Sequence, residues 1–137
     1  MNNKKYEILM DEKNTIRWQG HTLHRIKALR DFGDVKRGDL GGFVENESNL
    51  SHEGNCWLYN NAKAMDDSRL YDNSSMYDYS EISGNSEMHD NSAMYDSSEL
   101  NDNSKMHGKS EMHDNSTMHG DGEINDSVMY GDSKMCK

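Results

Sequence analysis

Large apolar residues recur every six positions along most of this chain. The series is Leu58, Ala64, Leu70, Met76, Ile82, Met88, Met94, Leu100, Met106, Met112, Met118 and Ile124. A small residue stands two positions before the next large one, in the series Ala62, Ser68, Ser74, Ser80, Ser86, Ser92, Ser98, Ser104, Ser110, Ser116 and Gly122. A period of six is a multiple of the two-residue period of a strand and does not fit the 3.6-residue period of a helix. The pattern therefore predicts short strands, each of which turns one large and one small side chain to the same side.

Pairs of turn-forming residues separate the expected strands, as in Asp72-Asn73, Gly84-Asn85 and Asp90-Asn91. Such residues suit a tight corner. Three strands and three corners would make a triangular coil of about eighteen residues, and successive coils would pair backbone to backbone at about 4.8 Å. The small column is mostly serine, so we expect these buried hydroxyl groups to find backbone acceptors.

The six-residue phase breaks twice. Leu50 and Leu58 are eight positions apart, and we interpret this first break as the join between the repeats and a lead-in segment. Ile124 and Met129 are five positions apart. The second break predicts the start of a C-terminal cap, because an open coil edge can recruit another chain.

The N-terminal segment has strand character without the full repeat. Its three candidate strands are Tyr6–Met10, Thr15–Trp18 and Thr22–Leu29, and a glycine-rich connection follows them. We therefore expect two parts, a small N-terminal β cap or lead-in over residues 1–43 and a repeat domain over residues 44–137.

Residues 76–81 and 94–99, MYDYSE and MYDSSE, resemble the units of hexapeptide-repeat left-handed β-helices. The stretches DFGDVKRGDLGGFV (31–44) and NLSHEGNCWLYNNA (49–62) are similar to the lead-in of a family of phage and bacterial β-helix proteins often labelled transferases. The resemblance implies an all-β fold, a single-stranded, left-handed parallel β-helix of about four to five coils behind a small N-terminal β cap. It also implies a phage or prophage origin.

Charge is distributed unevenly over the 137 residues. The formal net charge is −10, yet residues 1–57 hold nine basic and nine acidic side chains, so the whole excess lies on the repeats. An acidic surface keeps a thin solenoid soluble, or it binds a basic partner. The same charge disfavours direct binding to nucleic acid.

Cysteine and hydrophobic content favour a reducing compartment without membrane insertion. Cys56 and Cys136 are too few for a disulfide framework and too far apart for a Cys-x-x-Cys metal site. The chain shows no signal peptide and no apolar stretch of transmembrane length. We expect a protein of the bacterial host cytoplasm.

Four of the seven histidines, His89, His107, His113 and His119, follow an inward residue directly and are expected on the surface. A catalytic histidine needs a pocket and an orienting partner, and no long loop interrupts the repeats to build one. The calcium-binding nonapeptide is also missing. The sequence therefore predicts no catalytic residue, no metal, no cofactor and no enzymatic activity.

One expected outer face combines tyrosines and carboxylates. Its candidate partner-binding residues are Tyr77, Tyr79, Tyr95, Asp78, Asp96, Asp114, Glu81 and Glu99. Residues eighteen positions apart would stack in ladders on successive coils, where the aromatic rings either stabilise neighbouring strands or recognise a partner.

A rigid rod with evenly spaced carboxylates can imitate a phosphate backbone. The leading hypothesis is accordingly an acidic, phage-derived solenoid that mimics nucleic acid and inhibits a basic host defence protein, such as a CRISPR effector. The alternative is a structural scaffold that self-associates through its coil ends or a face. A third hypothesis is an acyltransferase-like enzyme.

Overall fold

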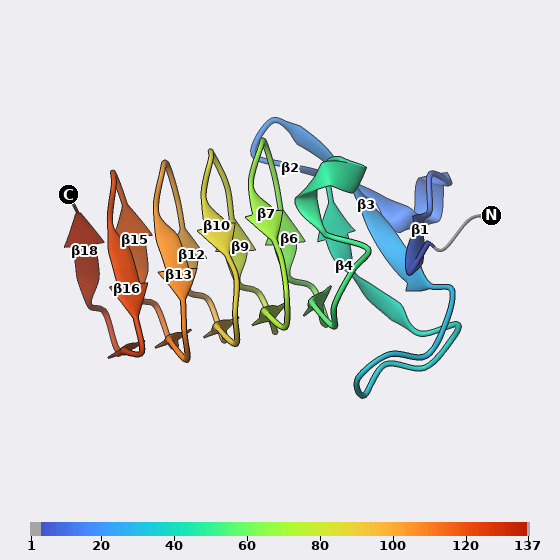
Figure 1. The fold of residues 1–137 in the computed structure, drawn as a ribbon. Helices are drawn as coiled ribbons and strands as arrows, with labels where there is room; N and C mark the ends of the chain where they lie inside the picture. Colours follow the sequence, from blue (N-terminus) through green and yellow to red (C-terminus); the bar gives the residue numbers. More distant parts are fainter. Residues whose placement is uncertain (1–3, 137) are drawn as a thin grey trace.

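The computed structural model describes residues 4–136 and shows a row of stacked coils with antiparallel β-structure at the N-terminal end (Figure 1). The coils number about five and form three parallel sheets, which confirms the predicted all-β solenoid. The first sheet contains β4 (Leu40–Val44), β6 (Lys63–Ala64), β9 (Glu81–Ile82), β12 (Glu99–Leu100), β15 (Thr117–His119) and β18 (Lys134–Cys136). The second contains β5 (Trp57–Leu58), β8 (Ser75–Met76), β11 (Ala93–Met94), β14 (Glu111–Met112) and β17 (Val128–Met129). The third contains β7 (Arg69–Leu70), β10 (Glu87–Met88), β13 (Lys105–His107) and β16 (Glu123–Asn125).

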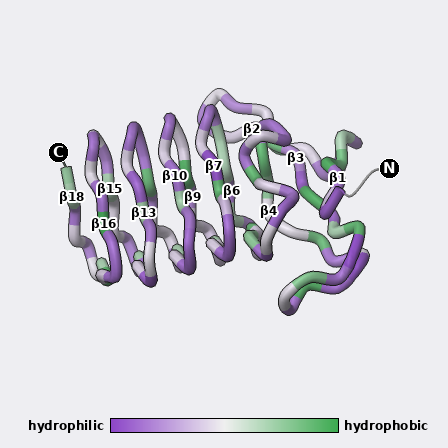
Figure 2. Tube along the Cα trace, in the orientation of Figure 1, coloured by the Kyte–Doolittle hydropathy of each residue, from purple (hydrophilic) through white to green (hydrophobic). Residues whose placement is uncertain are grey.

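The register of these sheets places equivalent residues of successive repeats side by side. Met88 pairs with Met106, and Ile82 pairs with Leu100. Between Leu58 and Ile124, each inward residue therefore lies above its counterpart eighteen positions away, and the solenoid core is one continuous column. Figure 2 shows the result along the coils, where short hydrophobic segments alternate with hydrophilic corners.

The small inward residues complete this core. The inward serines, which recur every six positions from Ser68 to Ser116, are fully buried. Nearly all of their hydroxyl groups donate to the carbonyl oxygen three residues earlier. The Ser98 Oγ atom, for example, lies 2.8 Å from the Tyr95 carbonyl oxygen. The expectation of backbone acceptors is confirmed, and the bond explains why serine recurs, because it closes the corner while filling little space.

Corners repeat one backbone conformation. The second residue after each inward residue has a φ of about +60°, as at Asp78 (62°), Asp96 (60°) and Asp114 (60°). Most L-residues avoid this region at a cost of about 1–2 kcal/mol, whereas Gly, Asn and Asp adopt it more readily. The chain places only these three residue types in this slot between positions 60 and 126, so local backbone energetics account for the composition.

The corner carboxylates also join one coil to the next. Asp90 Oδ2 accepts a hydrogen bond from the backbone N–H of Gly108 at 2.9 Å, and Asp102 Oδ2 accepts one from Gly120 at 2.8 Å. The parallel sheets direct other backbone N–H groups toward carbonyls of the following coil, as from Tyr77 to Met94 at 2.8 Å. The side-chain bond runs in the opposite direction, so the two coils are bonded reciprocally at each such corner.

The N-terminal segment covers the first coil. Strands β1 (Tyr6–Ile8) and β2 (Thr15–Trp18) pair antiparallel with β3 (His21–Ala28), and β3 pairs antiparallel with β4. Short 3-10 turns lie at η1 (Glu12–Asn14) and η2 (Glu47–Asn49).

A buried cluster closes the N-terminal end of the solenoid core. Tyr6, Ile26, Phe32 and Val35 pack with Trp57 in the same hydrophobic core as the inward column. The edge of the first sheet is therefore paired with β3, and the end of the core is covered.

The C-terminal end differs from the expectation. Val128 pairs with Glu111 and Met129 with Met112, so β17 continues the second sheet after a one-residue deletion. The shortened corner still bonds to its neighbour, since Asp126 Oδ1 accepts the N–H of Lys109 at 2.8 Å. The prediction of a C-terminal cap starting here is wrong, because one missing residue is absorbed in a corner and the strands of the last described coil stay in phase.

The hydrogen bond that Asp102 accepts at its corner predicts that different substitutions of Asp102 lower the free energy of unfolding by different amounts. Replacing Asp102 by Asn should leave stability almost unchanged, because Asn keeps an acceptor and tolerates a positive φ. Gly tolerates the backbone but loses the acceptor, and should cost about 1 kcal/mol. Ala loses both and should cost about 2–3 kcal/mol. Urea unfolding measures the order, and equal stability of the Asn and Ala variants would contradict the proposed role of the corner.

Candidate functional site

The aromatic residues of the predicted surface form a continuous stack along one corner. The rings of Tyr59 and Tyr77 have centroids 4.5 Å apart, those of Tyr77 and Tyr95 are 4.8 Å apart, and those of Tyr95 and His113 are 4.5 Å apart. The planes deviate by 8° or less. The spacing equals that of neighbouring strands, so each coil contributes one ring to a ladder that runs parallel to the solenoid axis.

The carboxylates of Asp78, Asp96 and Asp114 lie beside this ladder, and each uses one oxygen within the fold. Asp78 Oδ2 accepts the N–H of Asp96 at 3.0 Å, Asp96 Oδ2 that of Asp114 at 2.9 Å, and Asp114 Oδ2 that of Gly131 at 2.8 Å. Asp96 and Asp114 are nevertheless exposed and Asp78 is half-buried. A backbone donor holds each of these carboxylates in place, so this corner presents acidic groups at fixed positions.

Glu81 and Glu99 lie on the adjacent first sheet, where they are register neighbours. Burial raises the pKa of Glu81, and the neighbouring charge of Glu99 adds to this effect. Lys63 precedes Glu81 in the same column and offsets part of the repulsion. Seven of the eight predicted residues therefore divide into a corner ladder and a strand face.

Tyr79 belongs to a feature that the sequence did not indicate. It is 61% exposed and borders a groove of about 440 Å³ between the N-terminal hairpin and the solenoid. The groove is lined by Ile16, Arg17, Trp18, Phe43, Asn61, Lys63 and Tyr79. It combines aromatic walls with cationic groups, since Lys63 Nζ lies 4.4 Å from the centroid of the Trp18 ring.

Packing of the hairpin onto the outer surface of the coils creates this groove. Leu23 of β3 packs with Phe43 and Met65 in a second small core, and Ile16 and Trp18 of β2 cover it. Met65 occupies the slot that carries Tyr, His, Ser or Asn in later coils, and it is buried under the hairpin. An apolar residue in an otherwise polar column was the one sequence signal that could have indicated a covered coil face.

The histidines of the repeats lie on the corners, partly exposed. His89 and His107 stack with their centroids 5.3 Å apart. His107 Nε2 lies 2.8 Å from Glu123 Oε2, and His113 Nε2 lies 2.8 Å from Glu111 Oε1. His89, His107 and His113 thus take part in side-chain contacts within or between coils.

No family model matches this chain. A stretch of 37 residues is 49% identical to a protein of Escherichia coli K12 described as "Uncharacterized acetyltransferase YdcK". The match covers 27% of this chain, and the chain spans 11% of the length of that relative.

The match corrects one expectation from the sequence. The prediction that this chain is not an enzyme is wrong, because the similar protein is described as an acetyltransferase and enzymatic activity is therefore possible. The solenoid fold itself fits a scaffold or an acyltransferase-like protein. Within residues 4–136, no helix has the length and apolar character needed to cross a membrane.

The ring ladder predicts that Tyr95 contributes to stability through its two neighbours. Tyr95→Ala removes two stacked contacts and should lower the free energy of unfolding by about 2 kcal/mol. Tyr95→His, which copies the residue at His113 in the same column, should lower it by less than about 1 kcal/mol. Chemical denaturation of the two variants tests the ladder, and identical losses would show that stacking in this column carries no stability.

Proposed function

We propose that this chain is a recognition solenoid whose acidic corner binds a basic protein that handles nucleic acid. The observation that carries the proposal is the ladder of fixed negative charges beside an aromatic stack. Asp78, Asp96 and Asp114 stand one coil apart, and Tyr77 and Tyr95 run alongside them. Tyr is favoured in protein interfaces because its ring is large and its hydroxyl is polar.

The charge density supports mimicry of a polyanion. Residues 58–137 carry six basic and sixteen acidic side chains. At about 4.8 Å per coil of eighteen, these residues span ~21 Å of axis, or about one net negative charge per 2 Å. Duplex DNA carries about one per 1.7 Å. A groove of Lys and Arg that is tuned to nucleic acid would therefore meet a comparable field on this solenoid.

Pre-organisation supports the same proposal. Each ladder carboxylate is held by a backbone N–H, so its position is fixed before a partner arrives. Fixed charges lose less conformational freedom on binding than charges on long flexible side chains. A host defence nuclease such as a CRISPR effector is the class of target that such a surface suits, and inhibition would follow from occupation of its nucleic-acid channel.

The test removes charge while keeping the corner intact. Asn60 already occupies the ladder slot one coil before Asp78, and its Oδ1 accepts the N–H of Asp78 at 3.1 Å. The triple variant D78N/D96N/D114N should accordingly fold like the parent. As a matched control, D67N/D121N/E87Q removes three charges from other positions of the solenoid.

Immobilised parent and variant proteins are exposed to bacterial lysate, and captured proteins are quantified by mass spectrometry with and without competing duplex DNA. We expect nucleic-acid-handling proteins on the parent and the control, their loss from the triple Asn variant, and displacement by DNA. Binding should weaken by at least about tenfold between 50 and 200 mM salt. Equal capture by all three proteins, insensitive to salt and DNA, would contradict the proposal.

Acyl transfer is a second candidate function. The similarity to a protein described as an acetyltransferase favours it, and the groove beside Trp18, Lys63 and Tyr79 is the cavity described above that could hold a substrate. Acetyl-coenzyme A should then protect Trp18 from fluorescence quenching by a soluble quencher. Titration of parent and Trp18→Phe proteins with acetyl-coenzyme A measures this, and an unchanged quenching curve of the parent would count against acyl transfer at this groove.

A further inference from the structure

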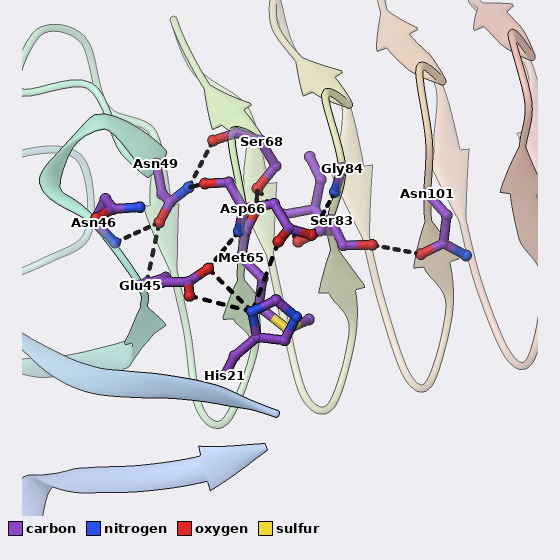
Figure 3. Close-up of polar contacts among 11 residues, drawn as sticks. His21, Glu45, Asn46, Asn49, Met65, Asp66, Ser68, Ser83, Gly84 and Asn101 are labelled. Carbon is purple, nitrogen blue, oxygen red and sulfur yellow. Dashed lines mark hydrogen bonds and ion pairs between the residues drawn. The ribbon is translucent and has the colours of Figure 1, made fainter. Parts of the chain in front are cut away.

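A histidine and two carboxylates converge where the tip of the N-terminal hairpin meets the first coils (Figure 3). His21 begins β3, Glu45 follows β4 directly, and Asp66 is the corner residue after β6. The three residues come from separate segments of the chain. His21 Nδ1 lies 3.2 Å from both Glu45 carboxylate oxygens and 3.7 Å from Asp66 Oδ1.

We propose that His21, Glu45 and Asp66 form a binding site for a divalent transition-metal ion of the zinc class. One candidate ligand atom from each residue lies within 4.8 Å of the other two. In a tetrahedral zinc site with bonds of about 2.1 Å, the ligand atoms are about 3.4 Å apart. The separations of 3.2 and 3.7 Å from His21 bracket that value, so small side-chain adjustments would suffice.

The hydrogen bonds around the cluster leave one oxygen of each carboxylate available to coordinate a metal ion. Glu45 Oε1 accepts the backbone N–H of Asp66 at 2.6 Å, and Asp66 Oδ2 accepts that of Gly84 at 3.0 Å. Glu45 Oε2 and Asp66 Oδ1 thus remain to face the imidazole. Each carboxylate is oriented by one bond and can coordinate an ion with its other oxygen, an arrangement typical of metal ligands with a supporting shell.

Asn49 fixes the backbone on both sides of the cluster. Its Oδ1 accepts the N–H groups of Glu45 at 3.0 Å and Asn46 at 2.7 Å. Its Nδ2 donates to the carbonyls of Asp66 at 3.1 Å and Ser68 at 2.8 Å. Asn49 is completely buried, so the segments that carry Glu45 and Asp66 are held in one geometry.

The electrostatics of the cluster favour a cation. Among residues 4–136, the ion-pair contacts of Glu45 and Asp66 are with His21 alone. Two carboxylates therefore face one imidazole, and a bound cation would lie between groups of opposite charge. An imidazole nitrogen with two carboxylate oxygens suits Zn²⁺ better than Ca²⁺ or Mg²⁺, which prefer oxygen ligands only. The side chains are 26%, 27% and 41% exposed, so an ion and its remaining water ligands have access.

A bound ion would link the N-terminal hairpin to the solenoid. His21 belongs to the hairpin, whereas Glu45 and Asp66 belong to successive coils, so one ion would join three segments. This inference does not depend on the proposed function, because Asp66 lies at the corner after the first sheet, whereas the Tyr–Asp ladder follows the second sheet, and because it needs no partner protein.

Zinc titration of the full chain tests the proposal, with isothermal calorimetry for stoichiometry and thermal unfolding for stability. The parent should bind one Zn²⁺ and unfold about 5 °C higher with zinc in excess, because an ion that binds only the folded state stabilises it. H21Q and D66N should each weaken binding by at least about tenfold. D66N keeps an acceptor for Gly84, so its metal-free stability should match that of the parent.

Two control variants exclude other ligands. His89 lies near Asp72 and Asp90 in a second group of similar composition but greater exposure, so H89N tests that group. Cys136 is an exposed thiol, so C136S tests thiolate binding. Zinc binding should be unchanged in both controls, and Co²⁺ should give a spectrum without a thiolate charge-transfer band. Absence of binding by the parent, or binding that survives in H21Q and D66N, would overturn the proposal.

Discussion

The reciprocal bonding of coils through corner carboxylates is the interaction on which the rest of the solenoid depends. At the corners with a positive φ, the backbone N–H donates to a side chain of the preceding coil, as those of Asp96 and Gly108 do. An aspartate one coil earlier supplies the acceptor, as Asp72 does for Asp90 at 3.0 Å. The same side chain thus satisfies an exposed N–H, tolerates the strained backbone and fixes the rise between coils.

This constraint also explains the acidic charge. Eight of the twelve corner slots between positions 60 and 126 carry Asp, so much of the negative charge follows from the way the coils are joined. Under the proposed function, recognition would use the same carboxylate atoms that join the coils. A surface built in this way cannot drift in position, because movement of a carboxylate would break a bond between coils.

The sequence predicted the repeating part of the fold well, because a strict period of six leaves few alternatives. The inward column from Leu58 to Ile124 and the buried serines followed from strand periodicity alone. The shortened corner near Asp126 was misinterpreted as the beginning of a cap. A deletion within a corner and the end of a repeat look alike in a sequence, whereas the pairing of Met112 with Met129 distinguishes them in the structure.

Other features could not be predicted because they depend on contacts between distant segments. The ladder aspartates were predicted as surface residues, but their bonds to N–H groups one coil away require the exact stacking of corners. The groove at Trp18 and the cluster at His21 depend on where the hairpin docks. Periodicity predicts the coils but gives no information on where the N-terminal hairpin packs across them.

The register of the coils has a consequence for how such a protein can change over evolutionary time. Since each coil bonds only to its two neighbours and the corners repeat one backbone conformation, duplication of eighteen codons would insert a coil without disturbing the others. Loss of eighteen codons would remove one equally cleanly. The length of the rod is then a heritable quantity that varies in steps of about 4.8 Å, and selection could match it to the footprint of whatever it contacts.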